Sequence, residues 1–290
     1  MKNSKKYKAL SRYSFSGHES FHCKSLWLKK GYDYLLSGGR FTDVDSVVKL
    51  GVGKNMVTAI RFWLRAFGLS QSESLSEMAD YLFRDGVGKD PFSEDINTIW
   101  LLHFHLVNSG VASLYRLLFI DFQRECKEFT REDFQTYVRR KCSVLEQKNV
   151  YNDNTVKKDI GVLLKNYVSP KDLKSIDDFS ALLLPLNLIV SKNSETYSFR
   201  EVDCEEIAPE IFLFALLTMA GGDRTISLDV LQRLSLILCL PITSLIDTIR
   251  SLEQLYPGYL IMSDNSGIKN VQFLKDIDKF DVLTHYYNSL

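Results

Sequence analysis

The hydrophobic positions of residues 43–69 follow the 3.6-residue period of an α-helix. At 100° per residue, a single apolar stripe contains Met56, Ile60, Trp63, Leu64 and Phe67. The opposite side of this predicted helix carries Lys54, Thr58, Arg61 and Arg65. One face of the helix can therefore pack against a core while the other stays in solvent.

A shorter predicted helix at residues 43–50 precedes this one, and Gly51-Val52-Gly53 separates the two. Glycine tolerates the backbone geometry of a tight turn, so the segment reads as a helix-turn-helix. In DNA-binding proteins with this motif, the second helix lies in the major groove, and a basic outer face suits that position. The alternative is an ordinary amphipathic helix with a solvated face.

The same periodicity predicts a helical middle region. The further helices expected before residue 179 cover residues 20–36, 74–83, 96–110, 114–126, 132–147 and 154–167. The last of them repeats the spacing of the first apolar stripe with Val156, Ile160, Leu163, Leu164 and Tyr167. Its opposite side carries Asn154, Lys158, Gly161 and Lys165. It is either a second helix-turn-helix with a less basic face or another amphipathic helix.

From about residue 179 the pattern changes to short apolar runs around a turn at residues 192–195, which predicts a strand pair. Helices at 209–220, 228–238 and 241–255 then precede two strands around the turn 264–267, in the order of a winged helix. The outer face of the third of these helices has no basic stripe. We therefore expect this unit to bind protein or to pack internally.

These elements predict a mainly α fold of tandem helix-turn-helix or winged-helix units with small β wings. Three units are expected: a basic N-terminal unit at 1–70, a helical middle domain at 71–178 and a winged-helix-like domain at 179–290. With 290 residues, 45% of them hydrophobic, the chain can fill several small cores. The five cysteines form no CxxC pair and no signal peptide or membrane span is evident, so we expect a cytoplasmic protein.

The net charge of zero conceals an asymmetry. Residues 1–70 hold thirteen Lys and Arg against four Asp and Glu, a balance of +9, and the rest of the chain sums to −9. Four lysines lie within the first eight residues, in an arm that can follow phosphates or serve only solubility. Because the excess coincides with the helix-turn-helix, a polyanion is the expected partner.

The run FSGHESFHC at residues 15–23 gathers the reactive side chains of the N-terminal unit. If the following helix reached back to His18, then His18 and His22 would share a face and could hold a divalent metal, with Glu19 as base or third ligand. The alternative is that His18 and Glu19 form local hydrogen bonds that fix a loop. His103 and His105 are two residues apart on an apolar helix, and we expect buried core histidines. The GxxxxGK[ST] spacing is missing, so no nucleotide cofactor is expected.

Several blocks together resemble the SspB-like family of bacterial proteins. They are FSGHESF, WLKKGYD, LGVGKNMV with IRFW, EDINTIWLLH and TVKKDIGVLLKNYV, and they span residues 15–168. The matching motif residues are Gly17, His18, Glu19, Gly51, Gly53, Lys54, Asn55 and Met56. The resemblance implies a DNA-nicking component of the Ssp phosphorothioation defence system, in which sulfur replaces a non-bridging phosphate oxygen in one DNA strand. It also implies three partners: the cysteine desulfurase SspA, the sulfur-transfer protein SspD and the ATPase SspC.

The leading hypothesis is a protein that binds duplex DNA through its N-terminal unit and nicks one strand. The residues expected to contact DNA are Lys54, Asn55, Thr58, Arg61 and Arg65. His18 and Glu19, with a divalent ion such as Mg²⁺, are the candidates for catalysis. The alternatives are a non-catalytic DNA-binding adaptor or transcription regulator, and a scaffold whose basic face meets an acidic protein.

Overall fold

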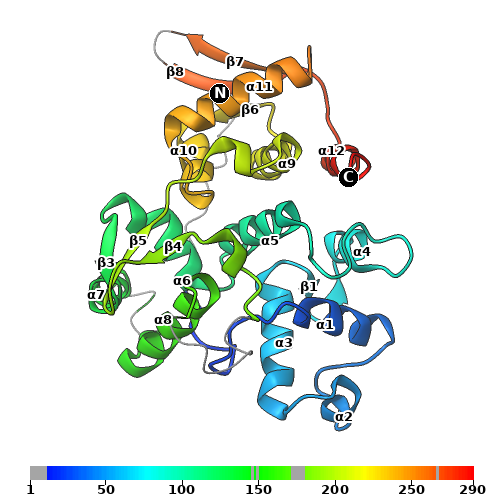
Figure 1. The fold of residues 1–290 in the computed structure, drawn as a ribbon, viewed down its shortest axis with the longest axis vertical. Helices are drawn as coiled ribbons and strands as arrows, with labels where there is room; N and C mark the ends of the chain where they lie inside the picture. Colours follow the sequence, from blue (N-terminus) through cyan, green and yellow to red (C-terminus); the bar gives the residue numbers. More distant parts are fainter. Residues whose placement is uncertain (1–11, 145–146, 148–149, 171–179, 266–267) are drawn as a thin grey trace.

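The computed structural model describes residues 12–144, 147, 150–170, 180–265 and 268–290. The lysine-rich arm at residues 1–8 lies outside this part of the chain. The helices are α1 Trp27–Leu36, α2 Ser46–Leu50, α3 Lys54–Ala66, α4 Glu77–Phe83, α5 Ile96–Ser109, α6 Ser113–Arg116, α7 Arg131–Lys141, α8 Asp153–Tyr167, α9 Pro209–Ala220, α10 Leu228–Ile237, α11 Ile242–Leu255 and α12 Lys279–Tyr287. The strands are β1 Ser70–Gln71, β2 Ser74–Leu75, β3 Glu128–Thr130, β4 Ile189–Ser191, β5 Thr196–Phe199, β6 Thr225–Ser227, β7 Leu260–Asn265 and β8 Ile268–Phe273. The fold is mainly α with small antiparallel sheets, as the sequence predicts (Figure 1).

Local sequence explains where several helices begin. Thr130 caps α7 in a reciprocal capping box with Asp133, and the side chain of Asn152 accepts a hydrogen bond at the start of α8. Pro209 occupies the first turn of α9, where its missing N–H costs no hydrogen bond. The capping box thus places the start of α7 at Arg131, one residue before the helix expected from residue 132.

Several elements in the structure differ from those predicted from the sequence. The helix expected from residue 20 begins only at Trp27, because the preceding residues are tied down in a non-helical path: Lys24 forms a β-bridge with Ala181 and the backbone N–H of Cys23 donates to Asn166. The helix expected to reach residue 147 ends at Lys141. The strands β1, β2, β3 and β6 and the helix α12 were not expected. The helix expected from residue 74 begins at Glu77, because β2 occupies residues 74–75.

Two three-stranded sheets share one strand order. β3, β5 and β4 pair in the order β3-β5-β4, and β6, β8 and β7 pair in the order β6-β8-β7, in both cases antiparallel. Because β3 pairs with β5, the hairpin after residue 179 completes a sheet with the helical middle region. Strand pairing therefore joins the two sides of the boundary expected at residue 178.

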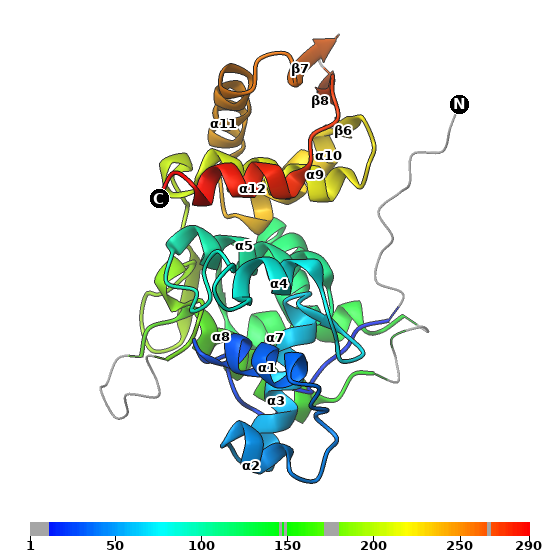
Figure 2. The same cartoon turned by 90° about the vertical axis from the view of Figure 1, so that its right-hand side faces the viewer.

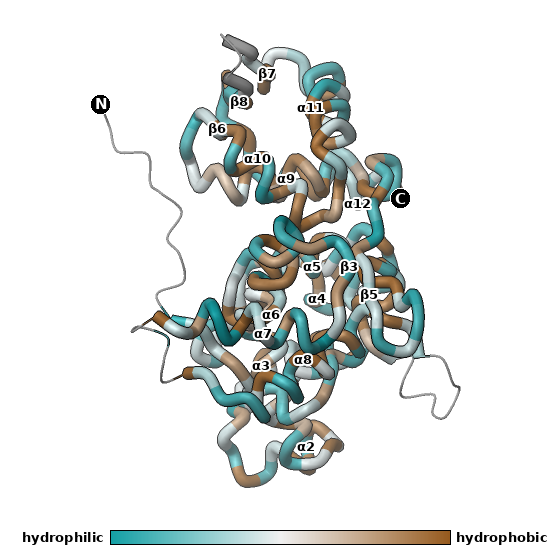
Figure 3. Tube along the Cα trace, turned by 90° about the vertical axis from the view of Figure 1, so that its left-hand side faces the viewer, coloured by the Kyte–Doolittle hydropathy of each residue, from teal (hydrophilic) through white to brown (hydrophobic). Residues whose placement is uncertain are grey.

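The core runs through α5 and continues into α9, whose apolar residues are largely buried. The trace of α9 is coloured mainly as hydrophobic in Figure 3. Helix α12 lies against α9 and also reaches α4 and the start of α5 (Figure 2). Tyr287 shares a 2.6 Å hydrogen bond with Thr98, and Tyr81 shares one of 3.1 Å with Thr284. The C-terminal helix therefore connects the last unit to the middle of the molecule.

Among the described residues, no one helix combines the length and the apolar composition needed to cross a bilayer. The pair α10 and α11 meets that criterion only when taken together, and the two helices bend by 108° at their junction.

Candidate nucleic-acid interface

Helices α2 and α3 occupy the segment in which the sequence predicts a helix-turn-helix, and residues 51–53 join them. Gly51, at φ +63°, ends α2 in the left-handed region, and Gly53 precedes α3 in an extended conformation. Ile60, Trp63 and Leu64 of α3 are fully buried. The apolar stripe read from the sequence is therefore the core face of this helix.

The opposite face of α3 is open to solvent over most of its length. Lys54, Asn55, Thr58 and Arg65 are exposed. No side chain caps the start of α3, so its first backbone N–H groups remain available beside Lys54. A helix N-terminus with free N–H groups attracts phosphate, and the neighbouring ammonium strengthens the attraction.

Arg61 differs from the other candidate DNA contacts. Its side chain is 41% exposed, and one of its Nη atoms lies 3.5 Å from Oε1 of Glu73, at the turn between β1 and β2. An ion pair within the chain neutralises part of the charge that Arg61 would offer to a phosphate. The sequence missed Glu73, although it lies in the Ser72-Glu73 turn directly after the helix-turn-helix.

The loop that carries His18 has an unusual backbone. Ser16, Gly17, Glu19 and Ser20 all have positive φ, between 48° and 100°. A Cβ at Gly17 would lie 2.6 Å from the ring of Phe62, so only glycine fits there. No helix reaches back to His18, and the helical face that would pair it with His22 does not form.

His18 is buried, and both of its ring nitrogens have partners within the protein. Nδ1 accepts a hydrogen bond of 3.2 Å from the backbone N–H of Ser20, and Nε2 lies 3.2 Å from Oδ1 of Asp159 on α8. A neutral ring with Nδ1 as acceptor carries its proton on Nε2, facing that carboxylate. Oδ2 of Asp159 accepts a further hydrogen bond from the backbone N–H of Ser16. This network holds the loop against α8.

The network also separates His18 from the basic face of α3. Its ring stacks on Trp63, which points into the core, and Arg65 lies two positions further along, on the opposite side of the helix. Glu19 is exposed at the loop surface. The structure thus gathers Lys54, Asn55, Thr58 and Arg65 on one face and places His18 on the other side.

The described residues do not fit the divalent metal site considered from the sequence. Magnesium prefers several oxygen ligands, and no group of three or more His, Cys, Asp or Glu side chains converges anywhere in the described part of the chain. The two carboxylate oxygens nearest His18 belong to Asp159 and already accept hydrogen bonds or an ion pair. No chemical step is therefore assigned to a metal ion here.

His103 is a core histidine, as expected. Its Nδ1 shares a 2.8 Å hydrogen bond with the hydroxyl of Tyr167, and its Nε2 one of 2.7 Å with the carbonyl of Ile237. Burial lowers the pKa of His103 to about 4, and burial together with Lys279 lowers the pKa of His105 to about 4. Both rings are therefore neutral near pH 7.

Asp159 is the residue of this region that sequence reasoning missed most clearly. It lies three positions after Val156 and one before Ile160, on the buried side of α8. A carboxylate next to the apolar stripe of a helix requires a buried partner. The position of Asp159 in the sequence pattern could therefore have indicated that it has one. Its partner, His18, lies 141 residues away and could not be read from the sequence.

Comparison with known proteins gives four findings. The family described as protein of unknown function (DUF4007) matches residues 15–287. A solved crystal structure of SspB is similar with a TM-score of 0.82 and 25% sequence identity, covering 96% of this chain and 89% of that one. A magnesium ion-bound crystal structure of SspB gives a TM-score of 0.81 with the same identity and coverage. No curated protein matches the chain. The chain therefore belongs to the DUF4007 family, and its similarity to SspB over nearly its whole length identifies it as SspB-like.

Proposed function

We propose that this protein binds duplex DNA through the exposed face of α3 and acts as the strand-nicking component of a bacterial Ssp phosphorothioation system. The observation that carries the binding proposal is the open face formed by Lys54, Asn55, Thr58 and Arg65 beside an uncapped helix N-terminus. The similarity to SspB supports the choice of system.

We further propose that the chain contains winged-helix units in tandem. Three segments repeat one order of elements, in which two consecutive helices are followed by a strand pair: α2-α3-β1-β2, α7-α8-β4-β5 and α10-α11-β7-β8. In the second and third segments an additional strand, β3 or β6, precedes the helices and joins the pair in the same strand order. Each unit would offer its second helix and its wing to a partner.

On this proposal, phosphate contacts supply most of the affinity. The expected contacts are Lys54, Arg65 and the N-terminus of α3, with Asn55 and Thr58 at groove edges and Arg61 contributing once Glu73 is displaced. SspA, SspC and SspD are the proposed protein partners. The described residues form no site for a divalent ion, but the magnesium ion-bound SspB structure supports testing Mg²⁺ in the nicking reaction.

The decisive experiment follows the conversion of supercoiled plasmid to open circles by the purified protein, with Mg²⁺ and with a chelator. We expect nicking by the wild type, and greatly reduced nicking by the Lys54→Ala/Arg65→Ala double variant. The variants Glu19→Ala and His18→Ala test the catalytic candidates, and a thermal melt checks that each is folded. If both single variants nick the plasmid as the wild type does, His18 and Glu19 are not catalytic residues.

A binding assay separates the alternatives. DNA binding without nicking by the wild type would favour the non-catalytic adaptor or transcription regulator. No binding to duplex DNA, or binding that does not weaken as salt rises, would favour a protein scaffold and contradict the proposal.

A further inference from the structure

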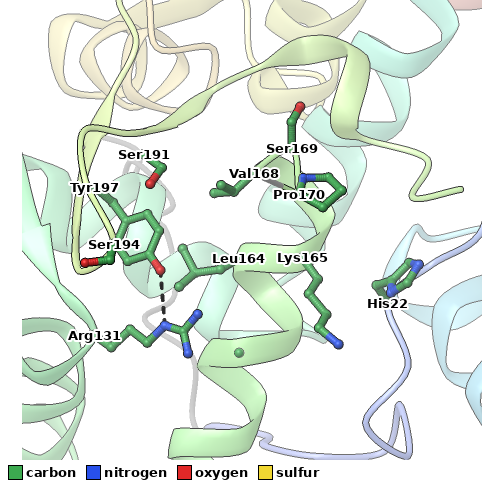
Figure 4. A pocket seen from close by; sticks show the side chains of 11 residues that line it. His22, Arg131, Leu164, Lys165, Val168, Ser169, Pro170, Ser191, Ser194 and Tyr197 are labelled. Atoms are coloured by element: carbon green, nitrogen blue, oxygen red, sulfur yellow. Dashed lines mark hydrogen bonds between the residues drawn. The ribbon is translucent and has the colours of Figure 1, made fainter. Parts of the chain in front are cut away.

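A pocket of about 420 Å³ lies between α8 and the hairpin formed by β4 and β5 (Figure 4). It is lined by His22, Arg131, Gly161, Leu164, Lys165, Val168, Ser169, Pro170, Ser191, Ser194 and Tyr197. These residues come from the N-terminal loop, from α7, from α8 and its C-terminal extension, and from the hairpin. Its size falls within the range of about 300–1,000 Å³ that small-molecule sites occupy.

The polar part of the pocket suits an anion. Two of the lining side chains are cations, Arg131 and Lys165, and none is a carboxylate. Nε of Arg131 donates to the hydroxyl of Tyr197 at 3.2 Å, which orients the guanidinium and leaves its terminal nitrogens for a ligand (Figure 4). Within the described ranges, neither cation has an ion pair with a carboxylate. Lys165 lies in the last turn of α8, where its charge offsets the partial negative charge of the helix C-terminus.

The remaining surface of the pocket is apolar. Leu164, Val168 and Pro170 form one wall, and the ring of Tyr197 contributes to the opposite side (Figure 4). Hydroxyl groups of three serines complete the lining. A phosphate alone would use only the polar part, whereas a nucleotide places its phosphate near the cations and its base against the apolar wall.

Gly161 leaves the side of α8 that lines the pocket without a side chain. Glycine weakens a helix interior relative to alanine, and Gly161 lies inside α8 with ordinary negative φ. A Cβ at Gly161 would have no neighbouring atom within 4 Å. The fold itself leaves room for a Cβ there, and a larger side chain at this position would extend into the pocket.

We propose that this pocket binds a nucleotide, with its phosphate held by Arg131 and Lys165 and its base packed against Leu164 and Tyr197. The nucleotide belongs either to a DNA strand or to a free mononucleotide pool. A nucleotide that belongs to a DNA strand rests on the proposed function of the protein. The binding of a phosphate by the two cations does not depend on that function.

Titration calorimetry with thymidine monophosphate and with thymidine tests the pocket. We expect the wild type to bind the monophosphate, and thymidine at least tenfold more weakly. Gly161→Leu fills the pocket and Lys165→Gln removes a cation, so each should weaken monophosphate binding at least tenfold. The matched control Lys157→Gln changes an exposed lysine of α8 outside the pocket and should bind as the wild type does. Thermal melts check that all three variants are folded.

Fluorescence anisotropy with labelled DNA distinguishes the two sources. Weaker DNA binding by Gly161→Leu, with α3 unchanged, assigns the pocket to a nucleotide of a DNA strand. Unchanged DNA binding together with lost monophosphate binding assigns it to a free mononucleotide. If the wild type does not bind the monophosphate and Gly161→Leu binds DNA normally, the inference is wrong. Failure of the wild type to bind any DNA contradicts the proposed function instead.

Discussion

Nε2 of His18 lies 3.2 Å from Oδ1 of Asp159, and this contact joins the N-terminal loop to α8 across 141 residues of sequence. Both side chains are buried. The same carboxylate accepts the backbone N–H of Ser16, so a single side chain satisfies two groups of the loop.

Asp159→Asn should lower the free energy of unfolding by about 1–3 kcal/mol, because a neutral amide cannot accept both contacts and one buried group loses its partner. Urea denaturation measures the change. The control Asp247→Asn removes an exposed carboxylate that lies 3.5 Å from Arg250, and should cost less than about 1 kcal/mol. Equal losses in the two variants would show that Asp159 has no special structural role.

Stability should fall in mild acid because of His103. Burial lowers its pKa to about 4 in the folded protein, whereas an unfolded histidine titrates near 6.5. The unfolded state therefore binds more protons between these values, and stability that is complete above about pH 6.5 is lost as the pH falls toward 4. The shift corresponds to about 3 kcal/mol.

Urea midpoints at pH 7.5 and pH 5 measure this effect. The wild type should lose more stability between the two values than His103→Gln, which has no imidazole to protonate at that position. His285→Gln, which changes an exposed histidine beside Glu210, serves as the control and should keep the wild-type difference. If His103→Gln loses as much stability between pH 7.5 and pH 5 as the wild type does, the loss does not come from His103.

Salt dependence should identify the phosphate contacts on α3. Each neutralised phosphate contributes about 0.9 to the slope of log K against log salt, so Lys54→Ala and Arg65→Ala should each lower the slope by about 1. Fluorescence anisotropy over a range of salt concentrations gives the slopes. Arg250→Ala, an exposed change on α11, should leave the slope unaltered, and a similar decrease there would mean that binding is not localised on α3.

Removing the internal partner of Arg61 should strengthen DNA binding. Glu73→Gln releases the guanidinium and removes a negative charge near the basic face, so affinity should rise by roughly threefold to tenfold, the equivalent of about 1 kcal/mol. The double variant Arg61→Ala/Glu73→Gln should lose most of this gain. Weaker binding by Glu73→Gln would show that the pair positions the helix for DNA.

Two glycines should respond oppositely to alanine. Gly161→Ala should raise stability by about 0.5–1 kcal/mol, because the helical backbone accepts a Cβ that meets no neighbour. Gly51→Ala should lower stability by about 1 kcal/mol, because φ is +63°. Thermal melts compare the two variants with the wild type. A destabilised Gly161→Ala variant would mean that α8 is strained at that position.

The hydrophobic periodicity predicted correctly which face of a helix is buried. The apolar stripes of α3 and α8 are the buried faces of these helices, because the 3.6-residue period alone determines which side chains share a side. The start of α1 was misplaced because contacts from Ala181 and Asn166, distant in sequence, hold the preceding residues in a non-helical path. Local pattern carries no information about such partners.

In the candidate site, too, some features follow from the local sequence pattern and others depend on contacts between distant segments. The exposure of Lys54 and Arg65 follows from the helical period, whereas the pairing of Arg61 with Glu73 depends on how the β1–β2 turn folds back. The pocket beside α8 combines side chains from four separate segments. No local pattern predicts that Arg131 and Lys165 line one cavity.

The pairing of β3 with β5 has a consequence for how the chain folds during synthesis. Thr130 pairs with Thr196, so 66 residues must be added after β3 before its partner exists. At about 5–20 residues per second this takes roughly 3–13 seconds, during which the edge of β3 remains unpaired near the ribosome. An unpaired strand edge invites association with other chains. Nascent chains stalled between residues 130 and 196 are therefore the ones that should depend most on chaperones.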